Sequence, residues 1–163
     1  MKLKIIRDEH AENPRTQFDH FGTFFMKHRR YDFGDKGAKE IDPETFDGLV
    51  LPVFMNDHGG LTINITGFSC PWDSGQIGWI YISREKILHE FSRKKMSKKL
   101  LEQARKNLIC EIEEIDHWLT GNVYGFETED GDSCWGFYGD NPKTNGIAEH
   151  LALPIEQYEV EYS

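Results

Sequence analysis

The chain has 163 residues and carries 19 lysines and arginines against 28 aspartates and glutamates, a formal net charge of −9. This length suits one globular domain, and the 13% of aromatic residues argues against disorder, because disordered chains have few large core residues. The acidity argues against broad coating of nucleic acid or of an anionic membrane. We therefore expect a single domain over residues 1–163.

The first third of the chain predicts strands and a long loop. Lysines alternate with apolar residues over 2–7, which favours an opening strand. Asn13-Pro14 then breaks the chain. The aromatic run over 18–31 suits a strand better than a helix, and the Gly- and Pro-containing stretch 32–48 predicts a loop.

The middle of the chain predicts a hairpin followed by a central strand. Two β-prone runs, 49–55 and 61–66, flank a connection that ends in Gly59-Gly60. Pro52 cannot donate a ladder hydrogen bond, so its strand should lie at an edge or a bulge there. The run 76–82 is apolar on both faces, as a central strand would be.

Two helices should follow. Ser83 is a good N-cap for a short helix that ends near Phe91, and Ser97 can cap a longer one over about 97–120. Gly121 stands where that helix should stop. Its apolar residues recur at steps of three or four and predict one buried stripe, formed by Leu101, Ala104, Leu108, Ile112, Ile115 and Leu119.

The last third predicts a second hairpin. The runs 122–127 and 133–138 flank an Asp-Gly turn. A short helix is expected within 139–151 and a final strand over 155–162. Strands interrupted by one long helix predict an α+β fold with a mainly antiparallel sheet.

Several separated blocks combine residue types that rarely occur together by chance. They are Asn13-Pro14-Arg15, Phe18-Asp19-His20-Phe21-Gly22-Thr23, His28-Arg29-Arg30-Tyr31, Asp57-His58-Gly59, Ser69-Cys70-Pro71-Trp72-Asp73-Ser74-Gly75-Gln76, Leu119-Thr120-Gly121 and Asp132-Ser133-Cys134-Trp135-Gly136-Phe137-Tyr138-Gly139. Together these blocks resemble a family of small proteins encoded by bacteriophages, prophages and plasmids. The resemblance covers roughly residues 2–150 and implies a mobile-element accessory protein, but it assigns no catalytic residue.

Catalysis would require a few dispersed residues to meet. His58 beside Asp57 could act as a general base, although both residues also suit a plain hairpin turn. Cys134 could serve as a nucleophile with them in a small hydrolase or transferase, or it could simply be a small apolar residue on a strand. HExxH, P-loop and GxGxxG motifs are absent.

Two segments carry binding hypotheses. The segment Cys70–Gly75 predicts either a preorganised recognition loop presenting Trp72 and Asp73, or a structural corner in which the indole fills the core. Arg29 and Arg30 could bind a phosphate-bearing small molecule, or they could pair with nearby carboxylates such as Asp32 or Asp35.

No metal and no cofactor are expected. The three cysteines lie far apart without a CxxC pair, which excludes a zinc ribbon. Cys110, Glu113, Glu114 and His117 share one face of the long helix, and a solvated face explains them better than a metal site. The N-terminus becomes charged before an apolar signal segment accumulates, so we expect a cytoplasmic protein without membrane contact.

The charge distribution favours binding to a host protein over enzymatic activity. From Glu111 to Glu161 there are 13 carboxylates and one lysine, so an acidic surface could dock on a basic partner. Its candidate residues are Glu127, Glu129, Asp130 and Asp132. Residues 84–106 are basic, and a local patch over Arg93–Lys99 is the one place where nucleic acid could bind.

Overall fold

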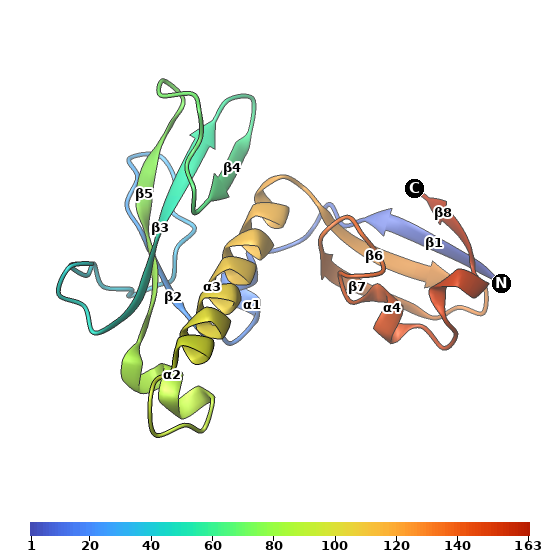
Figure 1. Ribbon diagram of the computed structural model, residues 1–163. Coiled ribbons are helices and arrows are strands. Elements are labelled where there is room, and N and C mark those ends of the chain that lie inside the picture. The colour runs from blue at the N-terminus through green and yellow to red at the C-terminus, as the bar shows by residue number, and fades with distance from the viewer. The chain divides into compact units, whose positions relative to one another are not determined.

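The computed structural model describes residues 1–163, and these form two compact units. Unit 1 consists of Met1–Glu12 and His117–Ser163, and unit 2 consists of Asn13–Asp116. The fold is α+β with mainly antiparallel sheets and one long helix, as predicted (Figure 1). The single domain expected over residues 1–163 stays a prediction.

Unit 2 is built on a four-stranded antiparallel sheet with the order β2-β5-β3-β4. Its strands are β2 (Thr23–Met26), β3 (Gly48–Asp57), β4 (Leu61–Asn64) and β5 (Ser74–Ser83). The central position of β5 is confirmed. Pro52 pairs with β5 at a point that β4 does not reach, one residue before a bulge, so β3 is locally an edge strand where the proline stands.

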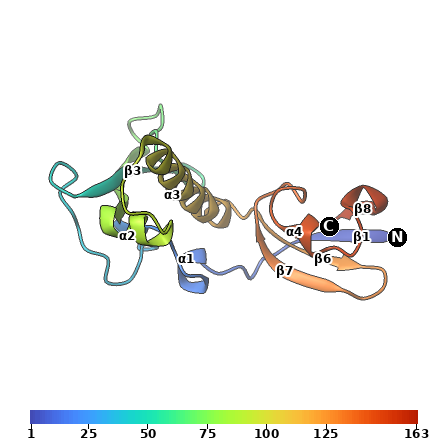
Figure 2. The same ribbon diagram turned by 60° about the horizontal axis from the view of Figure 1, so that its bottom comes forward.

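Three helices complete unit 2 (Figure 2). They are α1 (Pro14–Gln17), α2 (Arg84–Glu90) and α3 (Lys98–Leu119), whose last three residues are part of unit 1. Ser83 and Ser97 cap α2 and α3 through their hydroxyl oxygens, as predicted. Helix α1 was not predicted: Asn13 caps it and Pro14 opens it, so Asn13-Pro14 starts a helix six residues after β1 has ended.

The apolar stripe of α3 is confirmed in its middle, whereas its start differs and Leu119 at its end is only partly buried. Ala104, Leu108, Ile112 and Ile115 are buried. Leu101 is 41% exposed whereas Leu100 is 8% exposed, so the first turn buries the preceding leucine. Beyond the helix, Gly121 has a φ of +78°, and the N–H of the next residue, Asn122, donates to the His117 carbonyl.

A buried arginine fixes the segment around β2. The Arg15 guanidinium donates to both carboxylate oxygens of Asp35 at 2.7 Å and to the Gly22 carbonyl at 2.8 Å. Glu111 of α3 lies 3.6 Å from the same guanidinium and accepts from the Phe21 and Gly22 N–H groups. Burial raises the pKa of Glu111, outweighing the nearby positive charge and these hydrogen bonds.

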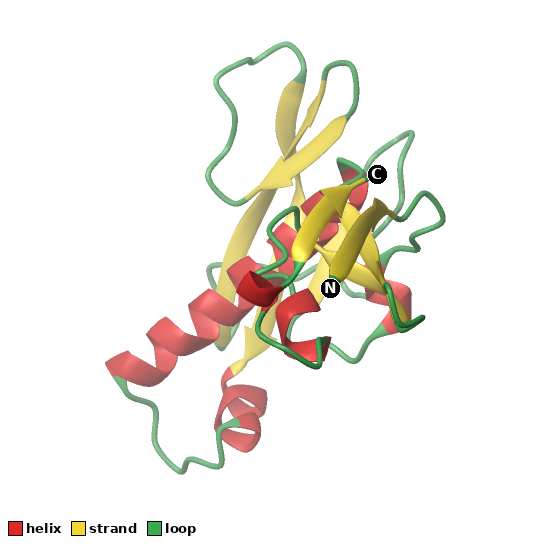
Figure 3. Ribbon diagram, turned by 90° about the vertical axis from the view of Figure 1, so that its right-hand side faces the viewer, coloured by secondary structure: helices red, strands yellow, loops and turns green.

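Unit 1 is a second four-stranded sheet with the order β7-β6-β1-β8. Its elements are β1 (Lys2–Arg7), β6 (Val123–Thr128), β7 (Ser133–Tyr138), α4 (Ile147–His150), a 3₁₀ turn at Ile155–Gln157 and β8 (Glu159–Tyr162), seen with the strands in yellow in Figure 3. The strand β8 pairs in parallel with β1 and is shorter than the predicted 155–162, because the 3₁₀ turn takes up its beginning.

One face of this sheet forms the core of unit 1. The buried residues come from the strands, from α4, from the 3₁₀ turn and from the residue that follows this turn, and they are Leu3, Ile5, Phe126, Phe137, Ile147, Ile155 and Tyr158. Among the helices of the chain, none combines the length and the apolar character that a membrane crossing requires.

Candidate functional site: a pocket at one end of the unit 2 sheet

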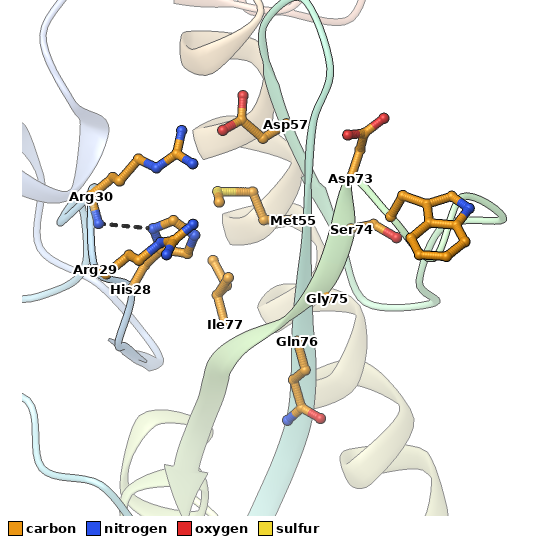
Figure 4. A pocket seen from close by; sticks show the side chains of 11 residues that line it. His28, Arg29, Arg30, Met55, Asp57, Asp73, Ser74, Gly75, Gln76 and Ile77 are labelled. Atoms are coloured by element: carbon orange, nitrogen blue, oxygen red, sulfur yellow. Dashed lines mark hydrogen bonds between the residues drawn. The ribbon is translucent and has the colours of Figure 1, made fainter.

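Three strand ends meet at one end of the unit 2 sheet and enclose a pocket. Met26, the last residue of β2, pairs with Gly78, and Asn56 near the end of β3 pairs with Ser74 at the start of β5. Because β5 lies between β2 and β3, the segment that follows β2 and the end of β3 lie on either side of the start of β5. They enclose a hollow of about 460 Å³ (Figure 4) lined by His28, Arg29, Arg30, Met55, Asp57, Trp72, Asp73, Ser74, Gly75, Gln76 and Ile77.

One wall of this pocket is a tight turn that presents two arginines. The Arg30 N–H donates to the His28 ring Nδ1 at 3.1 Å, and the His28 ring stacks on Tyr31 with centroids 5.2 Å apart. Arg29 and Arg30 are exposed, and neither guanidinium makes a hydrogen bond or an ion pair. The alternative that they pair with Asp32 or Asp35 is wrong, because no ion pair joins either arginine to a carboxylate and Asp35 is bound by Arg15.

The opposite wall is the loop that leads into β5. The Ser74 hydroxyl donates to the Cys70 carbonyl, and the Cys70 thiol donates to Asp73 at 3.7 Å, so the loop is held by its own polar groups. Trp72 is 91% exposed. The alternative of a structural corner filled by the indole is therefore wrong, and the loop instead presents a large aromatic surface to solvent.

Two aspartates belong to the same pocket and are each held by a neighbour. The Tyr31 hydroxyl donates to Asp57 Oδ2 at 3.2 Å. His58 Nδ1 lies 3.0 Å from Asp73 Oδ2, so the imidazole pairs with Asp73 and not with the aspartate beside it in sequence. The Asp57 N–H also donates to the Asp73 carbonyl at 2.8 Å, which ties the end of β3 to the loop.

The pocket thus combines opposite charges over an apolar floor. Met55 and Ile77 are buried beneath it, with the arginines on one side and the aspartates on the other. Arginine forks match phosphate or carboxylate oxygens, and oriented carboxylates accept N–H or O–H donors. Such a pocket can bind a ligand that carries both an anionic group and hydrogen-bond donors.

The predicted catalytic residues are divided between the two units. Asp57 and His58 stand at the tip of the β3–β4 hairpin in unit 2. Cys134 lies on β7 in unit 1, partly buried against the core of that unit. Neither unit by itself contains the three residues. Within unit 2, Cys70 and His58 both contact the Asp73 carboxylate.

The predicted acidic binding residues gather on one hairpin of unit 1. Glu127, Glu129, Asp130 and Asp132 are all exposed at the β6–β7 turn. Residues 1–12 carry three basic and three acidic side chains, and residues 117–163 carry one lysine and nine acidic side chains. Unit 1 therefore has a net charge of −8, nearly all of the charge of the chain.

Two other candidate regions are less well formed. No group of three or more histidine, cysteine or acidic side chains is placed to hold a metal ion. Burial and the surrounding glutamates on α3 raise the pKa of Cys110, which disfavours the thiolate that metal binding needs. Arg93, Lys95 and Lys99 line a second hollow beside Phe91, at the start of α3.

Part of the pocket could not be identified from motifs. The sequence predicts Met55 and Ile77 only as strand residues and Tyr31 only as part of the aromatic run over 18–31. Ile77 is the extra residue that β5 carries opposite the step from Val53 to Phe54, and such a bulge has no reliable sequence pattern.

Comparisons with known proteins add no constraint on this site. No protein-family model, no curated protein and no solved structure matches the chain.

Proposed function

We propose that this protein is a binding protein whose unit 2 pocket captures a phosphate-bearing ligand. The observation that carries this proposal is the pair of guanidinium groups, Arg29 and Arg30, that line a pocket without any protein partner. Arginine is the side chain that best matches phosphate oxygens, and the hydrogen bond from the Arg30 N–H to His28 holds the backbone of the turn that carries both arginines.

Ligand-induced stabilisation tests this function. The full chain is heated with pyrophosphate or with each of the four ribonucleoside triphosphates. A probe present at a hundred times its Kd stabilises the folded state by about 2.7 kcal/mol. For a chain of this size that raises Tm by roughly 5–10 °C. The double variant Arg29→Ala/Arg30→Ala should lose this rise.

A matched control removes the same charge elsewhere on unit 2. Arg105→Ala/Lys106→Ala deletes two adjacent exposed cations of α3 and should keep the ligand-induced rise in Tm. The proposal fails when none of the probes raises Tm, or when the rise survives in the Arg29→Ala/Arg30→Ala variant.

A second candidate is docking on a host protein through unit 1, as a mobile-element accessory protein would do. The net charge of −8 and the four exposed carboxylates of the β6–β7 hairpin favour it. Electrostatic complementarity speeds the encounter with a basic surface and weakens with salt. Wild-type and neutralised proteins are compared for the complex that they capture from a host lysate at low and high salt.

The neutralised variant replaces the four carboxylates of the hairpin with their amides. The control variant, Glu102→Gln/Glu113→Gln, neutralises exposed carboxylates of α3. Capture that is indifferent to the hairpin charges and to salt would rule out the acidic docking function.

A further inference from the structure

We propose that the ligand of the unit 2 pocket is a guanine nucleotide group, with its phosphate on Arg29 and Arg30 and its base bound by Asp57. This inference rests on the proposed function, because it requires a phosphate at the arginines. It adds the identity of the second half of the ligand, which the arginines alone do not specify.

The charges of the pocket exclude a simple polyanion as its best ligand. The unpaired guanidinium groups stand on one side, and the carboxylates of Asp57 and Asp73 stand on the other. A ligand that is anionic throughout would gain from the arginines and be repelled by the aspartates. The complementary ligand is anionic at one end and presents hydrogen-bond donors at the other.

The Asp57 carboxylate has unused acceptor positions that favour a ligand with two adjacent hydrogen-bond donors. Asp57 makes one side-chain contact, from the Tyr31 hydroxyl to Oδ2, while Asp73 already faces His58 and Cys70. Figure 4 shows the Asp57 and Arg30 side chains extending toward one another above Met55, and no ion pair joins them. Asp57 is therefore the acceptor with the most unused capacity in the pocket.

Guanine is the nucleobase that matches such an acceptor. Its N1–H and N2–H groups point in the same direction and can donate to both oxygens of one carboxylate, as an arginine fork does. Adenine offers one amino group next to an acceptor nitrogen, which a carboxylate repels. A bidentate contact of this kind discriminates between bases by about ten-fold or more.

The remaining walls suit a nucleotide. The exposed indole of Trp72 at the rim can stack on the flat face of a base, and Met55 and Ile77 give the floor an apolar surface. The volume of about 460 Å³ lies in the usual range for small-molecule sites. A free nucleotide and a guanosine within single-stranded RNA present the same chemistry.

Calorimetric titration of the full chain tests the inference with GMP, IMP and AMP. We expect GMP to bind about ten-fold or more tightly than AMP. IMP should fall between them, because inosine keeps N1–H and lacks the N2 amino group. Asp57→Asn should reduce the preference for GMP over AMP to near unity, and Tyr31→Phe, which keeps the carboxylate, should retain most of it. Trp72→Ala should weaken all three ligands by about five-fold or more.

Short RNA oligomers with one central guanosine or adenosine show whether the guanine group that binds belongs to a free nucleotide or to single-stranded RNA. Tighter binding of the guanosine oligomer than of GMP assigns the site to single-stranded RNA, and the reverse assigns it to the free nucleotide. Thermal unfolding of Asp57→Asn without ligand checks that it folds. If the variant does not fold, the affinities of the wild-type chain still test the inference, which requires GMP to bind most tightly, IMP less tightly and AMP least tightly.

The failures of the two proposals are distinguishable. Equal binding of GMP and AMP, lost in Arg29→Ala/Arg30→Ala, overturns the guanine inference and leaves a phosphate site. A preference for GMP that persists in Asp57→Asn overturns the assignment of the base to Asp57. When no nucleotide and no pyrophosphate binds, both the guanine inference and the phosphate-binding function are wrong.

Discussion

Replacement of Arg15 by methionine should be among the most destabilising single changes in unit 2. The Arg15 side chain is 1% exposed, and its partners Asp35 and Glu111 are 20% and 13% exposed. Methionine preserves much of the apolar volume but removes the donors that face two carboxylates and the Gly22 carbonyl. The variant therefore leaves two largely buried acidic groups without their cation.

The expected loss follows from this uncompensated charge. Removing one partner of a buried ion pair costs about 3–5 kcal/mol, because the remaining charge stays desolvated. Asp35 keeps one backbone donor, the Phe24 N–H at 2.8 Å, and Glu111 keeps two, so we expect about 3 kcal/mol, the lower end of that range. Arg15→Lys should lose less, since an ammonium keeps the charge but not the two-pronged contact.

Urea unfolding followed by tryptophan fluorescence and far-UV circular dichroism measures the change. Arg105→Met, an exposed arginine of α3, is the matched control and should change the free energy of unfolding by less than about 0.5 kcal/mol. Adding Glu111→Gln to Arg15→Met should recover part of the loss, because it removes one stranded charge. A loss below about 1 kcal/mol in Arg15→Met would refute this account of the buried charges.

Two further changes test other parts of unit 2. Gly78→Ala should lower the free energy of unfolding by more than about 2 kcal/mol, since a Cβ there would collide with the Phe25 carbonyl of β2, and urea unfolding measures it. Burial and the charge of Glu111 raise the pKa of Glu114, so the folded state binds protons more tightly and stability falls as pH rises above the ordinary carboxyl range. Glu114→Gln should therefore stabilise the protein by up to about 1 kcal/mol at neutral pH, with no gain below pH ~4, and Glu113→Gln on the exposed face is its control.

Local patterns predicted the elements whose signals are periodic. The stripe from Ala104 to Ile115 predicted α3, because burial on one face leaves a repeat in the sequence. The apolar run of β5 predicted a central strand, because burial on both faces leaves a continuous apolar run. The prediction that Leu101 is buried was wrong, and Leu100 is buried instead. Both residues lie in the first turn of α3, where a helix has the fewest neighbours to fix which face is buried.

The pocket was predicted only as separate pieces. Arg29 and Arg30, the loop with Trp72, and Asp57 were each recognised as candidates, and nothing in their spacing predicted that they meet. Their meeting depends on the strand order β2-β5-β3-β4, which places the end of β2 and the start of β5 at the same end of the sheet. Such pairing between distant segments is set by the tertiary fold and leaves no local pattern. The parallel pairing of β8 with β1 was missed for the same reason.

The proline in β3 has a consequence for the behaviour of the protein at high concentration. Between Gly48 and Val53 this strand pairs with β5 only, because β4 begins to pair at Phe54. An apolar strand with an uncovered edge can recruit the same strand of a second molecule and start aggregation. Pro52 supplies no N–H in the middle of that stretch, so a second chain could not form a continuous ladder along it. The residue that marks a local edge in the sheet therefore also protects the folded chain from adding strands to itself.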